Sequence, residues 1–176
     1  MIEQFEWYFI RATGSVAYLL LYLSVITGLY SQVRKKRKQK VNGTLFLHES
    51  LSNWALILVF GHLGFLLIDS YFKFTWKELL IPFNTTYQPF AMALGILSFY
   101  FLIVTVLTSK ARKKIGYQRW RKLHALNPFL YILVTLHGLL IGTDFQGTFL
   151  AVVNLAPLII MGFMMLGNKG KVNVSN

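Results

Sequence analysis

The chain has 176 residues, 55% of them hydrophobic, and a mean hydropathy of +0.52. A chain this short leaves much of its surface exposed after folding, so this composition excludes an ordinary soluble domain and indicates a polytopic membrane protein with lipid as its main partner. The net charge of +12 would suggest nucleic acid in a soluble protein, but here the basic residues flank apolar segments, and we expect no nucleic-acid partner. The absence of cysteine excludes disulfides, iron–sulfur clusters and thiolate-bound haem.

Five apolar segments are long enough to cross the roughly 30 Å hydrocarbon core of a bilayer as helices. In chain order we place them at residues 7–30, 45–69, 89–109, 123–142 and 147–167. The first is expected to be retained, because Glu3 and Glu6 precede it and no cleavage site follows. The second and fourth carry polar residues and histidines, which is typical of helices that line an interior site. The predicted fold is therefore an all-α membrane helix bundle of five transmembrane helices in one domain, residues 1–176.

The distribution of charge predicts the orientation of this bundle. The loops after the first and third segments, together with the C-terminal tail, carry 15 of the 18 Lys and Arg residues. All three lie on one side of a five-span protein, which the positive-inside rule makes cytoplasmic. We therefore predict an outer N-terminus and a cytoplasmic C-terminus in a plasma membrane, with a bacterial cell membrane as the expected location. The basic loops either set this topology alone or also form a docking surface for an acidic electron donor.

All four histidines lie in the second and fourth segments, His48 and His124 near the cytoplasmic ends and His62 and His137 toward the outer ends. The two segments run in the same direction, because one antiparallel span separates them. At about 1.5 Å per residue, the spacings of 14 and 13 residues put the two histidines of each segment roughly 20 Å apart. Two pairs therefore form at two depths, His48 with His124 and His62 with His137.

Two imidazoles from neighbouring helices are what a haem iron needs as axial ligands. A single zinc site is excluded by the distance between the two depths, and a zinc ion held by one pair would lack ligands. The sequence thus predicts two b-type haems per chain, with the four histidines as iron ligands. The small residues Gly61, Gly64 and Gly138 beside the histidines are expected to admit a broad macrocycle.

The helical phase places a condition on the second pair. Fourteen residues at about 100° each return His62 to within roughly 40° of the direction of His48. Thirteen residues leave His137 about 140° away from the direction of His124 on a straight helix. The pair formed by His62 and His137 therefore requires a distortion of the fourth segment, and Pro128 can supply it.

Two arginines are further candidates for cofactor binding. Arg11, about one turn inside the outer end of the first segment, can hold a haem propionate, or it can extend to lipid headgroups or pair with Glu6. Arg121 can hold a propionate at the cytoplasmic side, or its charge can serve only to set the orientation of the helices in the membrane. No general base, substrate pocket or flavin motif is visible, so no catalytic residue is predicted and the question whether the protein is itself an enzyme stays open.

Three stretches resemble the ferric reductase-like transmembrane domain family: R-A-T-G at 11–14, the spacing of His48 and His62, and W-R-K-L-H-A-L at 120–126 leading to His137. This family includes the membrane cores of NADPH oxidases and eukaryotic ferric reductases, and the bacterial haem-binding partner of a periplasmic methionine sulfoxide reductase. The resemblance implies two stacked haems between the histidine-bearing helices and electron flow outward from the cytoplasmic or quinol side. Many members have six spans, and the oxidases and ferric reductases continue into a flavin and nicotinamide domain, whereas only GNKGKVNVSN follows Leu166 here.

The predicted function is transmembrane electron transfer by a di-haem b-type cytochrome. A separate donor, either a flavoprotein or a quinol, is expected to supply electrons to an outer acceptor, which is ferric iron, dioxygen or a partner reductase. Two alternatives remain open: a haem-sensing or haem-handling membrane protein, and a haem-free structural or transport subunit that uses the histidines as polar contacts between helices.

Overall fold

The computed structural model describes residues 2–142, 155–157, 159–160 and 163. Seven α-helices fall within residues 2–142: α1 (Ile2–Lys36), α2 (Asn42–Ile68), α3 (Trp76–Leu80), α4 (Pro89–Lys110), α5 (Arg112–Ile115), α6 (Tyr117–His124) and α7 (Asn127–Ile141). The predicted fifth segment at 147–167 lies largely outside the described residues, and so does the C-terminal tail.

Four stretches are long and apolar enough to cross a membrane: Phe5–Lys36, Asn42–Ile68, Pro89–Lys110 and Tyr117–Ile141. They coincide with the first four predicted segments, so the prediction of a multi-pass membrane helix bundle is confirmed. The first helix is longer than predicted, because the basic residues Arg34, Lys35 and Lys36 form its last turn instead of a loop. Lysine and arginine are good helix formers, and their charge is favourable at the C-terminal end of the helix dipole.

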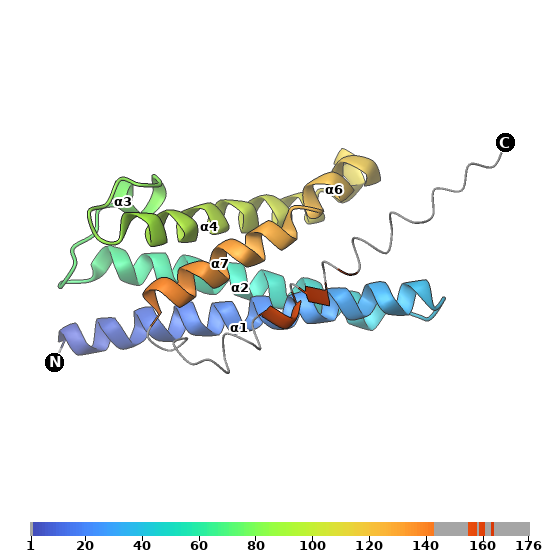
Figure 1. Ribbon diagram of the computed structural model, residues 1–176, viewed down its shortest axis with the longest axis horizontal. Helices are drawn as coiled ribbons and strands as arrows, with labels where there is room; N and C mark the ends of the chain where they lie inside the picture. Colours follow the sequence, from blue (N-terminus) through green and yellow to red (C-terminus); the bar gives the residue numbers. More distant parts are fainter. Residues whose placement is uncertain (1, 143–154, 158, 161–162, 164–176) are drawn as a thin grey trace.

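The long helices are arranged in antiparallel neighbours (Figure 1). Helix α1 packs along α2, α7 packs along α4, and α2 also contacts α4. Since α4 runs opposite to both, α2 and α7 point the same way along the bundle, as the sequence predicts. The beginning of α2 and the end of α6 therefore lie at the same end of the molecule, and the short helix α3 lies at the other.

The fourth predicted segment is broken into two helices. Helix α6 ends at His124 and α7 begins at Asn127, with Ala125 and Leu126 in a turn between them. Pro128 explains where the break falls, because in a continuous helix its ring would clash with the carbonyl of the residue four positions earlier, which is His124. Within α7 the proline lies in the first turn, where a missing N–H costs nothing. The predicted distortion of this segment is thus confirmed.

Halfway along the bundle, buried tyrosines fix α7 against α1. Tyr131 is fully buried, and its ring stacks on that of Tyr18 with the centroids 6.2 Å apart. The hydroxyl of Tyr18 donates to that of Tyr131 at 3.3 Å and lies 3.0 Å from the hydroxyl of Thr135. These bonds satisfy hydroxyl groups that would otherwise be stranded in an apolar interior. Leu29 is buried with Tyr131, and a second cluster of buried aliphatic side chains includes Leu21, Ala55 and Leu130.

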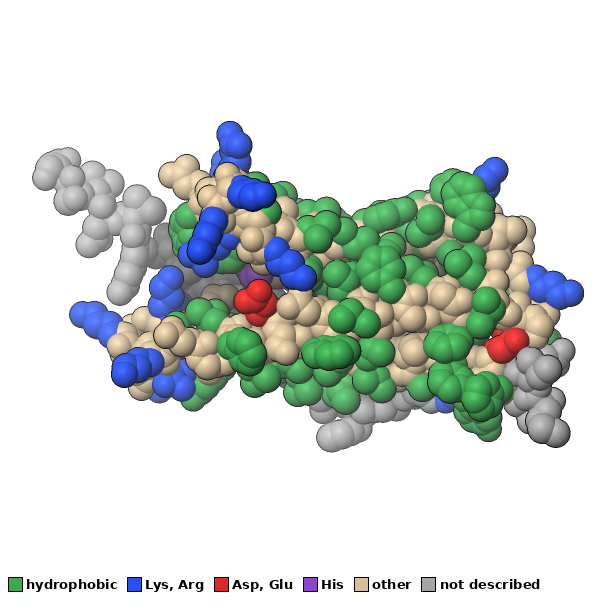
Figure 2. Space-filling view, turned by 180° about the vertical axis from the view of Figure 1, so that it is seen from behind, with side chains coloured by type: hydrophobic (Ala, Val, Ile, Leu, Met, Phe, Trp, Pro, Cys, Tyr) green, Lys and Arg blue, Asp and Glu red, His purple; other side chains and the backbone are tan. Residues whose placement is uncertain are grey.

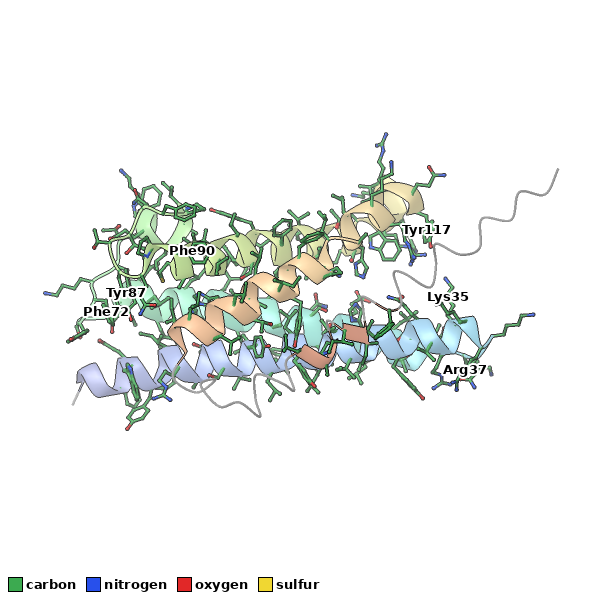
Figure 3. All side chains as sticks on the ribbon, viewed as in Figure 1. Lys35, Arg37, Phe72, Tyr87, Phe90 and Tyr117 are labelled. Carbon is green, nitrogen blue, oxygen red and sulfur yellow. The ribbon has the colours of Figure 1, made fainter. Side chains whose placement is uncertain are left out.

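The two ends of the bundle differ in chemistry. Most Lys and Arg side chains gather at one end, around the last turn of α1 and around α5 and α6 (Figure 2). Lys35 and Arg37 mark this basic end, whereas Phe72, Tyr87 and Phe90 lie at the far end (Figure 3). Large apolar side chains are exposed along the helices between the ends, which is the surface that hydrocarbon solvates.

At the far end, the loop between α2 and α4 is ordered by its own hydrogen bonds. Thr75 and Glu78 form a capping box at the start of α3. The Glu78 carboxylate accepts hydrogen bonds from the Thr75 backbone N–H at 2.9 Å and from its hydroxyl at 2.7 Å, and these two bonds hold the pKa of Glu78 below its ordinary value. The Glu6 carboxylate accepts from the N–H and hydroxyl of Ser70, at 2.9 and 2.6 Å, which ties this loop to α1.

Candidate cofactor site between the histidine-bearing helices

The structure brings the four histidines together in two pairs. At the basic end, the ring centroids of His48 and His124 are 6.0 Å apart and the ring planes are 82° apart; we call these two residues the basic-end pair. His62 and His137 both line one cavity nearer the far end, and we call them the far-end pair. Two imidazoles that bind one metal ion from opposite sides, each through a bond of about 2 Å, have centroids about 6 Å apart. The basic-end pair has this separation.

Three of the four imidazoles are held in the same way, by a hydrogen bond from Nδ1 to a backbone carbonyl of a neighbouring helix. The bonds are His48 to Ser24 at 2.7 Å, His62 to Ile10 at 2.9 Å, and His137 to Ala91 at 2.8 Å. A carbonyl oxygen only accepts, so each bond assigns the proton to Nδ1 and leaves the lone pair on Nε2. This arrangement orients a metal-binding imidazole and raises its basicity.

A glycine lies four residues after each of these carbonyls, and the imidazole occupies the space that a side chain would fill. A Cβ atom added to the glycine would meet the ring at these distances: Gly14 to His62 Nδ1, 3.1 Å; Gly28 to His48 Nδ1, 3.1 Å; Gly95 to His137 Nδ1, 2.7 Å. We call each combination of a carbonyl and the following glycine a glycine seat. An added Cβ would displace the ring at Gly95, and at Gly14 and Gly28 the ring would have to shift by a few tenths of an ångström.

The two seats on α1 share a sequence signal. Thr13 and Thr27 precede Gly14 and Gly28, and their hydroxyls lie 3.2 Å from the Ile10 carbonyl and 2.9 Å from the Ser24 carbonyl, the same carbonyls that the imidazoles use. The Thr13 hydroxyl donates at a shorter distance, 2.6 Å, to the Phe9 carbonyl. The two Thr-Gly pairs are 14 residues apart, which is the spacing of His48 and His62 on the antiparallel helix. This match of spacings was available in the sequence and was missed.

The glycines chosen from the sequence lie elsewhere. A Cβ atom on Gly61 would meet only Thr13, at 3.8 Å, and one on Gly64 would meet nothing within 4 Å among the described residues. Gly138 lines the cavity beside His137. The seats are formed by glycines of the facing helices α1 and α4, and proximity to a histidine in sequence does not reveal them.

His124 is held differently from the other three histidines. Its ring stacks on Trp120, with centroids 5.0 Å apart and planes 28° apart. The amide nitrogen of Asn127 lies 3.3 Å from Nε2 and 3.4 Å from Nδ1. Trp120 in turn donates from Nε1 to the hydroxyl of Ser109 on α4, at 3.1 Å. For His124, stacking on Trp120 of the same helix takes the place of a glycine seat.

The cavity of the far-end pair has a volume of about 710 Å³ and is lined by α1, α2, α4, α7 and the loop around α3. Cofactor pockets typically have volumes of about 300 to 1,000 Å³ and mainly apolar walls. Phe72, Phe74 and Tyr87 from the loop contact one another at the far end of this cavity, with ring centroids 4.5 to 6.0 Å apart. The aromatic loop between α2 and α4 thus covers one end of the cavity.

The two predicted arginines differ in position. Arg11 lines the cavity of the far-end pair, and its guanidinium lies 4.2 Å from the centroid of the Trp7 ring. Arg121 is exposed on α6, one turn before His124. Trp54 and Phe60 on α2 are 58% and 53% exposed.

The histidine pairs fit a metal ion that already has most of its ligands from a cofactor. Within the described residues, no group of three or more His, Cys, Asp or Glu side chains could hold a bare metal ion. A haem iron needs only two axial ligands, which the imidazole pairs offer, and its porphyrin suits apolar walls.

These features define the class of protein: it is a multi-pass membrane helix bundle in which helices that run in the same direction carry pairs of histidines. A family model described as ferric reductase like transmembrane component matches residues 13–135, and the chain belongs to this family. The matched region includes three of the histidines and ends just before His137. Domains of this family generally bind haem, and membership suggests a function in transmembrane electron transfer. Searches of curated proteins and of solved structures found no match.

Proposed function

We propose that this protein is a di-haem b-type cytochrome that transfers electrons across a membrane. His48 and His124 would bind the haem at the basic end, and His62 and His137 the haem at the far end. The observation that supports this most strongly is the orientation of the imidazoles: three of them direct Nδ1 to a carbonyl and keep Nε2 for a metal. A histidine used only as a polar contact between helices can bond through either ring nitrogen, whereas these three all use Nδ1.

Bound haem supplies a centre that accepts and releases one electron at a time. The chain itself sets the conditions for that exchange. The carbonyl bonds raise the basicity of the imidazoles, and the apolar cavity walls keep water and other ligands away. Arg11 provides a guanidinium beside the far-end pair that can bind a propionate, and Arg121 lies near the basic-end pair for the same purpose.

The orientation of the bundle gives the transfer its direction. We place the basic end in the cytoplasm, because clustered Lys and Arg residues stay on that side of a membrane. The donor is then a cytoplasmic flavoprotein or a membrane quinol, and the acceptor outside is ferric iron, dioxygen or a partner reductase. The membrane is the plasma membrane, in a bacterium.

Histidine substitutions test the di-haem proposal. We expect the wild-type protein to carry two haems per chain and each single His→Ala variant to carry one. The pairing makes a sharper prediction: a double variant within a pair, His48→Ala with His124→Ala, keeps one haem, whereas a double variant across the pairs, His48→Ala with His62→Ala, keeps none. Haem-to-protein stoichiometry and reduced-minus-oxidised absorption spectra measure both. The exposed Trp54→Ala variant is the control and should keep two haems.

A colourless wild-type protein from haem-replete cells would contradict the proposal. So would retention of one haem in the double variant across the pairs, because it would mean that the histidines bind in other combinations.

The orientation is tested separately with single cysteines, which is straightforward because the natural chain has none. Lys38 follows α1 at the basic end, and Lys73 lies in the loop before α3. In spheroplasts, we expect a membrane-impermeant maleimide to label Lys73→Cys and to leave Lys38→Cys unlabelled until the cells are lysed. The reverse pattern would place the basic end outside and would reverse the direction of electron transfer.

A further inference from the structure

We propose that Trp120 is the positioning residue for His124, and that His124 is the one exchangeable imidazole of the four. This inference rests on the proposed function and deepens it, since it assigns the binding of small external ligands to the haem of the basic-end pair. The observation behind it is the different environment of this ring.

Two directional constraints hold each of the other imidazoles. The bond from Nδ1 to the carbonyl fixes the rotation of the ring, and the contact with glycine fixes its distance from the helix. His48 has further support, because the hydroxyl of Ser24 lies 2.9 Å from its Nδ1 and 2.7 Å from the hydroxyl of Ser52. Displacing any of these three rings would leave buried polar groups without partners.

His124 lacks this kind of support within the described part of the chain. The Asn127 amide nitrogen lies 3.4 Å from its Nδ1 and 3.3 Å from its Nε2, so it is no nearer to Nδ1 than to the nitrogen that would bind the metal. An amide nitrogen donates, so this contact does not place a proton on Nδ1 and does not raise the basicity of Nε2 as a carbonyl would. The side-chain oxygen of Asn127 is buried and has no hydrogen-bond partner among the described residues. His124 is therefore the least well prepared of the four as a metal ligand.

The stack on Trp120 orients the His124 ring without a directional bond. The indole is itself well fixed: Nε1 donates to Ser109, the Ser109 hydroxyl donates to the carbonyl of Thr105 at 2.7 Å, and the Arg112 guanidinium lies 4.6 Å from the indole ring centroid. A face contact sets the tilt of the imidazole but allows it to slide and turn in its own plane. Trp120 thus keeps the ring in place without locking it.

The backbone at His124 adds to this freedom. His48, His62 and His137 lie within long helices, whereas His124 is the last residue of the short helix α6 and is followed by the turn that Pro128 imposes. Because a turn separates His124 from α7, the imidazole can leave its stack on Trp120 without a change in α7 or in the far-end pair. A ligand position that opens in this way opens only at the basic end.

Carbon monoxide and imidazole are the probes for this position. We compare wild type, Trp120→Ala, Trp120→Phe and Ser109→Ala, with Trp54→Ala as the control. Loss of a group that supports a ligand lowers metal-site affinity by about 10- to 100-fold. In dithionite-reduced Trp120→Ala, we therefore expect either carbon monoxide binding to one haem per chain or loss of that haem alone. Added imidazole should restore the low-spin spectrum where the haem remains.

The milder variants separate positioning from a general structural role. Trp120→Phe keeps an aromatic face and should stay close to wild type, while Ser109→Ala frees the indole and should give partial carbon monoxide binding. This binding should persist when Ser109→Ala is combined with His62→Ala and His137→Ala, and vanish when it is combined with His48→Ala and His124→Ala.

The inference would be wrong if Ser109→Ala and Trp120→Ala both had the same carbon monoxide binding and the same haem content as the control. It would also be wrong if carbon monoxide bound only to the far-end haem. If Trp120→Ala does not fold, carbon monoxide binding by Ser109→Ala alone tests the inference. Failure of the proposed function is distinguishable, because the wild-type protein would then lack two haems before any variant is made.

Discussion

Gly95→Ala is expected to remove the haem that we propose for the far-end pair. The added Cβ would lie 2.7 Å from both Nδ1 and Cε1 of His137, so the ring must leave its seat. Leaving the seat breaks the bond to the Ala91 carbonyl, which holds the ring in the orientation proposed for metal binding. We expect one haem per chain in place of two, measured by haem-to-protein stoichiometry, with the spectrum of the basic-end haem unchanged.

The control for Gly95→Ala is Gly64→Ala. Gly64 is exposed on α2 near His62, and its added Cβ would meet nothing within 4 Å among the described residues, so two haems should remain. Gly14→Ala and Gly28→Ala should be intermediate, because their contacts with the rings are 3.1 Å and a shift of a few tenths of an ångström relieves them. Full haem content with an unaltered spectrum in Gly95→Ala would show that this seat is not needed.

Tyr131→Ala is expected to destabilise the bundle by about 3 kcal/mol or more, the cost typical of truncating a buried aromatic residue. Tyr131 is fully buried against α1, and in a membrane such packing is the main force that holds helices together. Tyr131→Phe keeps the ring and removes the hydroxyl that bonds to Tyr18, so it should cost about 1 kcal/mol. Unfolding in mixed micelles of a mild detergent and dodecyl sulfate, followed by circular dichroism, gives both values.

Ile132→Ala is the matched control for Tyr131→Ala. Ile132 is the next residue on α7 but is 37% exposed on the outer surface of the bundle, so its truncation should cost much less. Equal destabilisation by Tyr131→Ala and Ile132→Ala would mean that the tyrosine cluster does not join α7 to α1.

The sequence determined that this chain crosses a membrane several times and that its histidines lie at two depths. Hydropathy sufficed for the helices, because only a helix satisfies its own backbone in lipid. Depth followed from the spacing of residues along a helix and from the direction of each span. That is why His48 could be assigned to the level of His124 without any knowledge of packing, and the structure has their rings 6.0 Å apart. The position of the helix break also followed locally, from Pro128.

Only the tertiary structure decided which side chain faces which. In a soluble protein, polar residues mark the outer face of a helix, but in lipid both faces are apolar, so periodicity does not show how each helix is rotated about its axis. The seats at Gly14, Gly28 and Gly95 depend on that rotation, as does the stacking of Trp120 on His124. Depth is a property of one chain segment and can be read from it, whereas the contact between two helices exists only once both have been placed.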